Sequence, residues 1–232
     1  MISDSNIWRA ELFRDLADLR RRLRHAATPK SRGTTEGLLA KVEKFTFSSA
    51  FIVRKLMDGW KLSDELESGR LLIRKFPVID NDRLIDYINC HRGLEFYDFD
   101  KGRDANILPR DLCNLLIHSM VFCPLLTEDE RKVTALLFNS DRTRYEALFQ
   151  IDLDVYLAFI DEVIADEIVS AAYYRWKGTV FKTRELSRAS FERMARLSIE
   201  NLPPNFVLAP LTRSHVEEMM RLTKGRASSR RD

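Results

Sequence analysis

Three side chains between residues 108 and 122 have types and spacings that could carry out chemistry. At 100° per residue of an α-helix, Arg110, Asn114 and His118 fall within about 80° of arc on one face. A histidine can exchange a proton near neutral pH, an arginine can hold a phosphate, and an amide can orient a ribose or the imidazole. The three together would suit metal-independent cleavage of RNA, in which the ribose 2′-hydroxyl attacks the neighbouring phosphate.

The same spacing also fits a purely structural role. Residues four apart on a helix are neighbours, so Asn114 and His118 can satisfy each other and bond to a nearby loop or hairpin. The helix would then belong to a non-enzymatic interaction module that serves as a scaffold or dimerises. Whether the chain is an enzyme stays open at this point.

Other familiar chemistries find no support in the sequence. It contains no Gly-rich phosphate loop, no GxSxG elbow, no HExxH helix and no EF-hand loop. Cys113, His118 and Cys123 are zinc-ligand types, but a spacing of five turns each about 140° around a helix from the last. Three cysteines without a CxxC pair indicate reduced thiols. We therefore expect no metal and no other cofactor.

Hydrophobic periodicity predicts which elements hold the candidate residues. Long helices are expected over residues 7–24, 36–60 and 155–176, and the helix over 108–122 should end before Pro124. Two apolar runs joined by a polar turn predict a β-hairpin at residues 132–151. The fold class predicted is mainly α, a bundle of four or five long helices with a small β-hairpin or short antiparallel sheet inserted there.

Three connecting segments have weaker patterns. Residues 70–79 fit either a short strand or an extended connector, and the sequence does not decide between them. A short helix is expected over residues 83–89, followed by a loop with a short strand at residues 93–103.

The composition changes after Thr179, which predicts two domains. Residues 1–178 would form the helical core domain with its hairpin, and residues 179–232 a helical C-terminal appendage with a basic tail. Charged helices are expected over 184–200 and 212–223. Such an appendage could hold a second copy of the chain or clamp a partner protein.

Basic residues gather at the two ends of the chain. Residues 1–32 hold eight Lys and Arg against four Asp and Glu, although the net charge of the whole chain is only +3. Clusters of this kind supply the sequence-independent part of nucleic-acid binding, although a solvated helix face is the alternative. The predicted nucleic-acid contacts are Arg20, Arg21, Arg24, Lys30 and Arg32.

The segment Cys113-Asn114-Leu115-Leu116-Ile117-His118 resembles the RNxxxH motif of HEPN domains, which are small all-α modules that commonly dimerise. Several HEPN domains are metal-independent ribonucleases of toxin, abortive-infection and CRISPR systems, and others bind nucleotides or act as scaffolds. Asn114 and His118 match the motif. Cys113 stands in place of its arginine, so Arg110 would have to supply the cation from one turn earlier.

No apolar run is as long as a membrane span, and the N-terminus lacks the features of a secretory signal. We therefore expect a cytoplasmic protein with no membrane partner. The resemblance implies an RNA- or nucleotide-binding protein, with ribonuclease activity in a bacterial defence or toxin system as its enzymatic form. A homodimer or a complex with a partner protein is expected.

Overall fold

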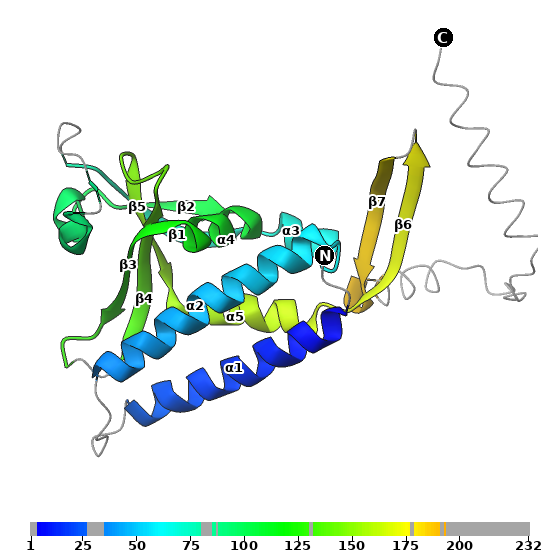
Figure 1. Cartoon of the computed structure of the whole chain (residues 1–232), viewed down its shortest axis with the longest axis horizontal. Helices are drawn as coiled ribbons and strands as arrows, with labels where there is room; N and C mark the ends of the chain where they lie inside the picture. Colours follow the sequence, from blue (N-terminus) through cyan, green and yellow to red (C-terminus); the bar gives the residue numbers. More distant parts are fainter. Residues whose placement is uncertain are drawn as a thin grey trace, which may run out of the picture. The chain divides into compact units, whose positions relative to one another are not determined.

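The structure is a computed structural model in which residues 4–26, 35–79, 85–86, 88–129, 132–176, 179–190 and 193 are described (Figure 1). The helices are α1 (Ser5–Ala26), α2 (Thr35–Asp58), α3 (Asp64–Ser68), the 3-10 helix η1 (Cys90–Phe96), α4 (Pro109–Ile117) and α5 (Leu153–Ala165). The strands are β1 (Leu71–Pro77), β2 (Arg103–Ile107), β3 (Ser119–Leu126), β4 (Val133–Ser140), β5 (Ala147–Asp152), β6 (Ile168–Trp176) and β7 (Thr179–Ser187). The chain divides into two units, Met1–Phe191 and Glu192–Asp232, and all of these elements belong to the first.

A five-stranded antiparallel sheet organises the first unit. Its strand order is β2-β1-β5-β4-β3, so β4 and β5 are interior strands. Successive side chains of a strand point to opposite faces. Accordingly Leu136 and Phe138 join the core on one face, whereas Leu137 and Leu148 join a second core on the other. Both faces of the central strands are therefore covered.

Four helices cover one face of the sheet. Helix α1 packs on α2 and α5, α2 packs on α4, and both α4 and α5 pack on β4, as Figure 1 shows. Their apolar stripes recur at helical spacing, for example Leu12, Leu16 and Leu19 of α1, which are almost fully buried. The result is one continuous core between the helices and the sheet.

The second face is covered by the segment around η1. Ile85, Phe96 and Tyr97 pack there against side chains of β1, β4 and β5. The Tyr97 hydroxyl accepts a hydrogen bond from Asn139 Nδ2 at 2.5 Å and donates one to the Arg144 carbonyl at 2.7 Å. The Asn139 Oδ1 atom in turn accepts from the Val121 N–H at 3.0 Å. This network satisfies a buried amide within the sheet.

The predicted helical bundle is wrong, because a five-stranded antiparallel sheet forms the centre of the described fold. The predicted hairpin at residues 132–151 is confirmed as β4 and β5, but these strands lie in the middle of that sheet rather than in an insertion. The undecided segment at 70–79 is strand β1, which pairs with both β2 and β5. The first two long helices are confirmed as α1 and α2.

Two predicted helices are too long because each runs into a strand. The helix expected over 108–122 ends at Ile117, and β3 follows and pairs with β4. The helix expected over 155–176 ends at Ala165, and β6 follows and pairs with β7. In both cases strand pairing with a later segment outweighs the local helical period, and Pro124 is tolerated because β3 is an edge strand.

Several expectations fall partly or wholly outside the described residues. Within the helix expected at 83–89, residues 83, 84 and 87 are not described, and residues 88 and 89 form a turn. Residues 184–187 belong to β7, whereas 194–232, including the second expected helix and the basic tail, lie outside. The β6–β7 hairpin crosses residue 178, and the two-domain division at that point stays a prediction. No helix within the described ranges combines the length and the apolar character needed to cross a membrane.

Candidate functional site

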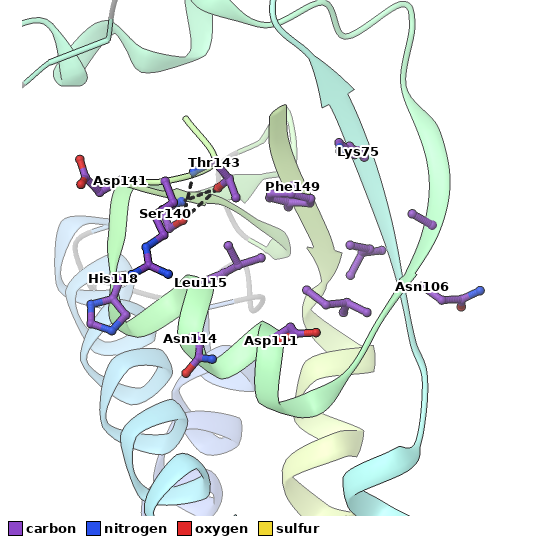
Figure 2. A pocket seen from close by; sticks show the side chains of 14 residues that line it. Lys75, Asn106, Asp111, Asn114, Leu115, His118, Ser140, Asp141, Thr143 and Phe149 are labelled. Atoms are coloured by element: carbon purple, nitrogen blue, oxygen red, sulfur yellow. Dashed lines mark hydrogen bonds between the residues drawn. The ribbon is translucent and has the colours of Figure 1, made fainter. Parts of the chain in front are cut away.

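A pocket of about 710 Å³ lies between α4 and the helix-covered face of the sheet (Figure 2). Strands β1, β2 and β5 and the turn after β4 complete its walls. Its lining residues are Ile73, Lys75, Ala105, Asn106, Ile107, Asp111, Asn114, Leu115, His118, Ser140, Asp141, Arg142, Thr143 and Phe149. Pockets of about 300–1,000 Å³ with apolar walls and a few polar groups are typical of small-molecule sites.

Helix α4 positions the polar side chains of one wall. Pro109 occupies its first turn, where the missing N–H costs nothing. The helix ends at His118, whose backbone leaves the helical conformation at φ −104° and ψ 26°. Measured around the helix, Asp111, Asn114 and Leu115 lie on the side that faces the sheet.

His118 lies at the C-terminal end of α4, next to the turn at residues 141–143. Its N–H bonds to the Asn114 carbonyl at 3.1 Å, and its own carbonyl accepts from the Asp141 N–H at 3.2 Å. The side chain is exposed. Among the residues that the structure describes, the imidazole has no hydrogen-bond partner. His118 is therefore fixed by its backbone and keeps both ring nitrogens available to a ligand.

Asn114 has a partner outside the pocket. Its Oδ1 atom accepts a hydrogen bond from Arg54 Nε of α2 at 2.9 Å. The bond expected between Asn114 and His118 side chains is not formed in the described structure, because the amide carbonyl is directed at α2. Arg54 was not predicted from the sequence, since it lies 60 residues away on another helix.

Arg110, the third predicted residue, does not line the pocket. Its Nη1 atom bonds to Asp58 Oδ1 at 3.1 Å, and its Nη2 atom lies 3.8 Å from Glu67 Oε2. Arg54 also pairs with Asp58, so that the two arginines share one carboxylate. Arg110 lies where α4 packs against α2, and its side chain is part of this ion-pair cluster. The structure thus places Asn114 and His118 in the lining of the pocket and Arg110 outside it.

Four charged residues of the pocket were not predicted from the sequence. Lys75 comes from β1 and lies 5.7 Å from the ring centroid of Phe149. Asp141 and Arg142 come from the turn after β4, and Asp141 pairs with Arg144 at 2.8 Å. Asp111 was missed although it lies only 60° from Asn114 around α4, so the helical spacing could have identified it. Lys75 and Arg142 carry no such signal, because the sheet alone brings them to α4.

The charges of the pocket are unevenly compensated. Within the described ranges Lys75, Arg142 and Asp111 have no ion-pair partner, whereas Asp141 is paired with Arg144. Figure 2 shows Lys75 and Thr143 across the pocket from Asp111 and Asn114. The pocket therefore offers the Lys75 ammonium and the Thr143 hydroxyl at one end, and the Asn114 amide and the Asp111 carboxylate at the other.

The predicted nucleic-acid contacts of α1 are not part of this pocket. Arg20 forms two hydrogen bonds to the Asp161 carboxylate of α5, at 2.9 Å and 2.5 Å, and Arg21 pairs with Asp18. Arg24 is exposed on the same helix. Lys30 and Arg32 lie outside the described residues. Two of the five predicted cations are thus already partnered by carboxylates.

Cys113 of α4 is deeply buried. Burial raises the pKa of the Cys113 thiol to about 12, although Arg54 and Arg110 nearby oppose this shift. The thiol therefore stays protonated and inert at neutral pH. No group of three or more His, Cys, Asp or Glu residues that could hold a metal ion occurs in the part of the chain that the structure describes.

The arrangement supports binding of an anionic ligand with polar groups at its other end, next to the exposed imidazole of His118. The all-α fold that the HEPN resemblance implies is not the fold of the described residues. The resemblance itself stays a prediction based on Asn114 and His118. No protein-family model matches the chain, and comparisons with curated proteins and with solved structures also give no match.

Proposed function

We propose that this protein binds a nucleotide, free or within RNA, in the pocket between α4 and the sheet. The observation that carries the proposal is the pair of cations, Lys75 and Arg142, which line the pocket together with His118 and lack an ion-pair partner among the described residues. Cations of this kind recognise phosphate. A volume of about 710 Å³ is large enough for a nucleotide.

In its enzymatic form, the pocket would cleave RNA without a metal ion. The His118 imidazole would accept the proton of the ribose 2′-hydroxyl as this oxygen attacks the adjacent phosphorus. The bond from phosphorus to the 5′-oxygen would then break, leaving a 2′,3′-cyclic phosphate, and the leaving oxygen would take up a proton. Lys75 and Arg142 would stabilise the charge that develops on the phosphate oxygens.

A fluorescence-anisotropy titration with a labelled single-stranded RNA of about twelve nucleotides tests the binding step. We expect Lys75→Ala together with Arg142→Ala to weaken binding at least about tenfold and to reduce its salt dependence, because two phosphate contacts are lost. Lys44→Ala, which removes an exposed cation of α2 that neither lines the pocket nor belongs to the predicted nucleic-acid contacts, is the matched control and should change the affinity less than about twofold. Equal affinities of the double variant and the wild type would contradict the proposal.

A cleavage assay tests the enzymatic form with the same RNA. His118→Ala should abolish the formation of 2′,3′-cyclic phosphate ends, and it should relieve any growth arrest that the wild-type protein causes when expressed in bacteria. Because the imidazole is exposed, the variant should fold, and its thermal midpoint should stay within a few degrees of the wild type. Undiminished cleavage by a folded His118→Ala protein would exclude this role.

A second function, a non-enzymatic interaction module, is favoured by the contacts of Arg54 and Arg110. Both arginines pair with Asp58, and Arg54 also holds Asn114, so two of the three candidate residues, Arg110 and Asn114, join α4 to α2. This function predicts a stable homodimer or partner complex of the full chain by sedimentation, with no measurable binding of RNA or nucleotides.

A further inference from the structure

We infer that the pocket recognises guanine, with Asp111 and Asn114 contacting the edge of the base that forms Watson–Crick pairs. Because this inference rests on the proposed function, it names the base that the nucleotide pocket selects. It is argued from the hydrogen-bonding direction of two neighbouring side chains on α4.

The direction of the Asn114 amide follows from Arg54. An arginine Nε–H can only donate, so the atom of Asn114 that faces it at 2.9 Å must be the carbonyl oxygen. The Nδ2 group is then the part of the amide that remains for a ligand, since Asn114 also lines the pocket. Asn114 therefore presents hydrogen-bond donors to the pocket.

Asp111 presents the opposite character. Its ionised carboxylate has acceptors only. The side chain is exposed, lines the pocket and has no ion-pair or hydrogen-bond partner within the described residues. Residues three apart on a helix are neighbours, with Cβ atoms about 5–6 Å apart. One wall of the pocket thus offers a pair of acceptors beside a donor.

Guanine matches this order of groups. Its pairing edge carries two adjacent donors, N2–H and N1–H, followed by the acceptor O6. The two donors fit the Asp111 carboxylate, and O6 fits the Asn114 amide. Adenine presents only one donor on this edge, beside the lone pair of N1, which the carboxylate would repel. Cytosine also presents an acceptor beside its donor, and uracil has a single donor between two acceptors.

The opposite end of the pocket suits the rest of the nucleotide. Lys75 and Thr143 lie across the pocket from Asp111 and Asn114 in Figure 2. A guanine held by α4 therefore directs its ribose and phosphate toward Lys75 and Thr143. The base contacts select the ligand and the phosphate contacts hold it, a division common in nucleotide recognition.

Calorimetric titrations of the full-length protein with GMP and AMP test the inference. We expect the wild type to bind GMP at least about tenfold more tightly than AMP. In Asp111→Asn, which replaces one acceptor by a donor, the two affinities should come within about threefold of each other. Asp154→Asn is the matched control, because Asp154 is also an exposed acid in the first turn of a helix but does not line the pocket, and it should keep the preference for GMP.

Arg54→Met supplies a second, independent test. Without the Nε donor the Asn114 amide is free to turn over, so the preference for GMP should fall while AMP is still bound. A circular-dichroism melt checks that this variant is folded. An unchanged preference for GMP in folded Arg54→Met would overturn the assigned role of Arg54.

The remaining outcomes separate the two proposals. Equal binding of GMP and AMP by the wild type would overturn guanine recognition and leave nucleotide binding intact, whereas no binding of either nucleotide or of RNA would overturn both.

A single-stranded RNA with one guanosine, compared with the same RNA carrying adenosine instead, shows whether guanine is read within a strand. Preference in the RNA pair as well as for GMP supports RNA as the source of the base, and preference for GMP alone supports the free nucleotide.

Discussion

Tyr97 lies at the centre of the polar network on the second face of the sheet. Its hydroxyl is the common partner of the Asn139 amide and the Arg144 carbonyl, and burial raises the pKa of the phenol well above its usual range. We expect Tyr97→Phe to lower the free energy of unfolding by about 1–3 kcal/mol, because two buried groups lose their partner. Urea denaturation measures this change.

Tyr145→Phe is the matched control for Tyr97. The residue is 41% exposed, and its hydroxyl donates to the Ile85 carbonyl at 3.5 Å. The expected change is below about 0.5 kcal/mol. Equal losses in the two variants would show that the network around Asn139 contributes nothing specific to the sheet.

Cys113 and Cys123 should differ in reactivity. Cys113 is fully buried with a pKa of about 12, so about one thiol in ten thousand is ionised at pH 8. Cys123 is half-buried on the edge strand, and burial raises its pKa as well. Alkylation of the native protein followed by peptide mass spectrometry should label Cys123 well before Cys113. In denatured protein the two cysteines should be labelled at similar rates. Similar rates for Cys113 and Cys123 in the native protein as well would contradict the buried position of Cys113.

Some residues of the pocket could be predicted from the sequence, and others could not. His118 and Asn114 were predictable because both lie on one helix, where spacing alone places them on a common face. The direction of the Asn114 amide was not, because it depends on Arg54 from α2. Lys75 and Arg142 were not predictable either, since only the packing of α4 on the sheet brings them to the pocket.

One buried cation, Arg9, links α1 to α5 and to the segment that follows α2. Arg9 donates to the Val163 carbonyl at 3.3 Å and to the Lys61 carbonyl at 2.5 Å, and only 9% of the residue is exposed. We expect Arg9→Met to cost about 3 kcal/mol of unfolding free energy, because buried carbonyls lose their donor. Arg14→Met, at an exposed position on the same helix, should cost less than about 0.5 kcal/mol in the same denaturation experiment.

A second link joins α1 to α2 and depends on pH. Lys41 of α2, with Arg22 and Arg21 of α1, holds the pKa of the Asp18 carboxyl well below its usual range. Since the pKa is lower in the folded state, this stabilisation is present above the unfolded-state pKa of about 3.9 and is lost as the pH falls below it. The gap between the melting temperatures of wild type and Asp18→Asn should therefore narrow as the pH falls from 6 to 3. A gap that is constant over this range would contradict the account.

Elements were predictable where local pattern and tertiary contacts agree. The spacing of hydrophobic residues is helical in α1 and α2 and strand-like in β4 and β5, and each of these elements matches its prediction. Two of the failures are segments whose first half is helical and whose second half pairs as a strand, α4 with β3 and α5 with β6. An apolar run without a clear break has no local signal for such a change, because the pairing partner lies elsewhere in the chain.

On the scale of the whole molecule, the antiparallel sheet decides what the candidate residues can do. Strands β1, β2 and β5 lie side by side and form the wall opposite α4, so residues as far apart in the chain as Ile73 and Phe149 come together around one pocket. A helical bundle would have surrounded His118 with apolar helices. The sheet instead leaves the end of α4 exposed beside cations from two other elements.

A chemical-shift map of the full-length protein titrated with GMP tests the central claim most directly. We predict that the largest and saturable shift changes come from the His118 imidazole and from the backbone amides of pocket-lining residues, at 105–107, 111, 114, 115, 118 and 140–143. Lys75→Ala together with Arg142→Ala should abolish these changes at the same concentration of GMP. Changes confined to α1, or no change at millimolar GMP, would contradict nucleotide binding in this pocket.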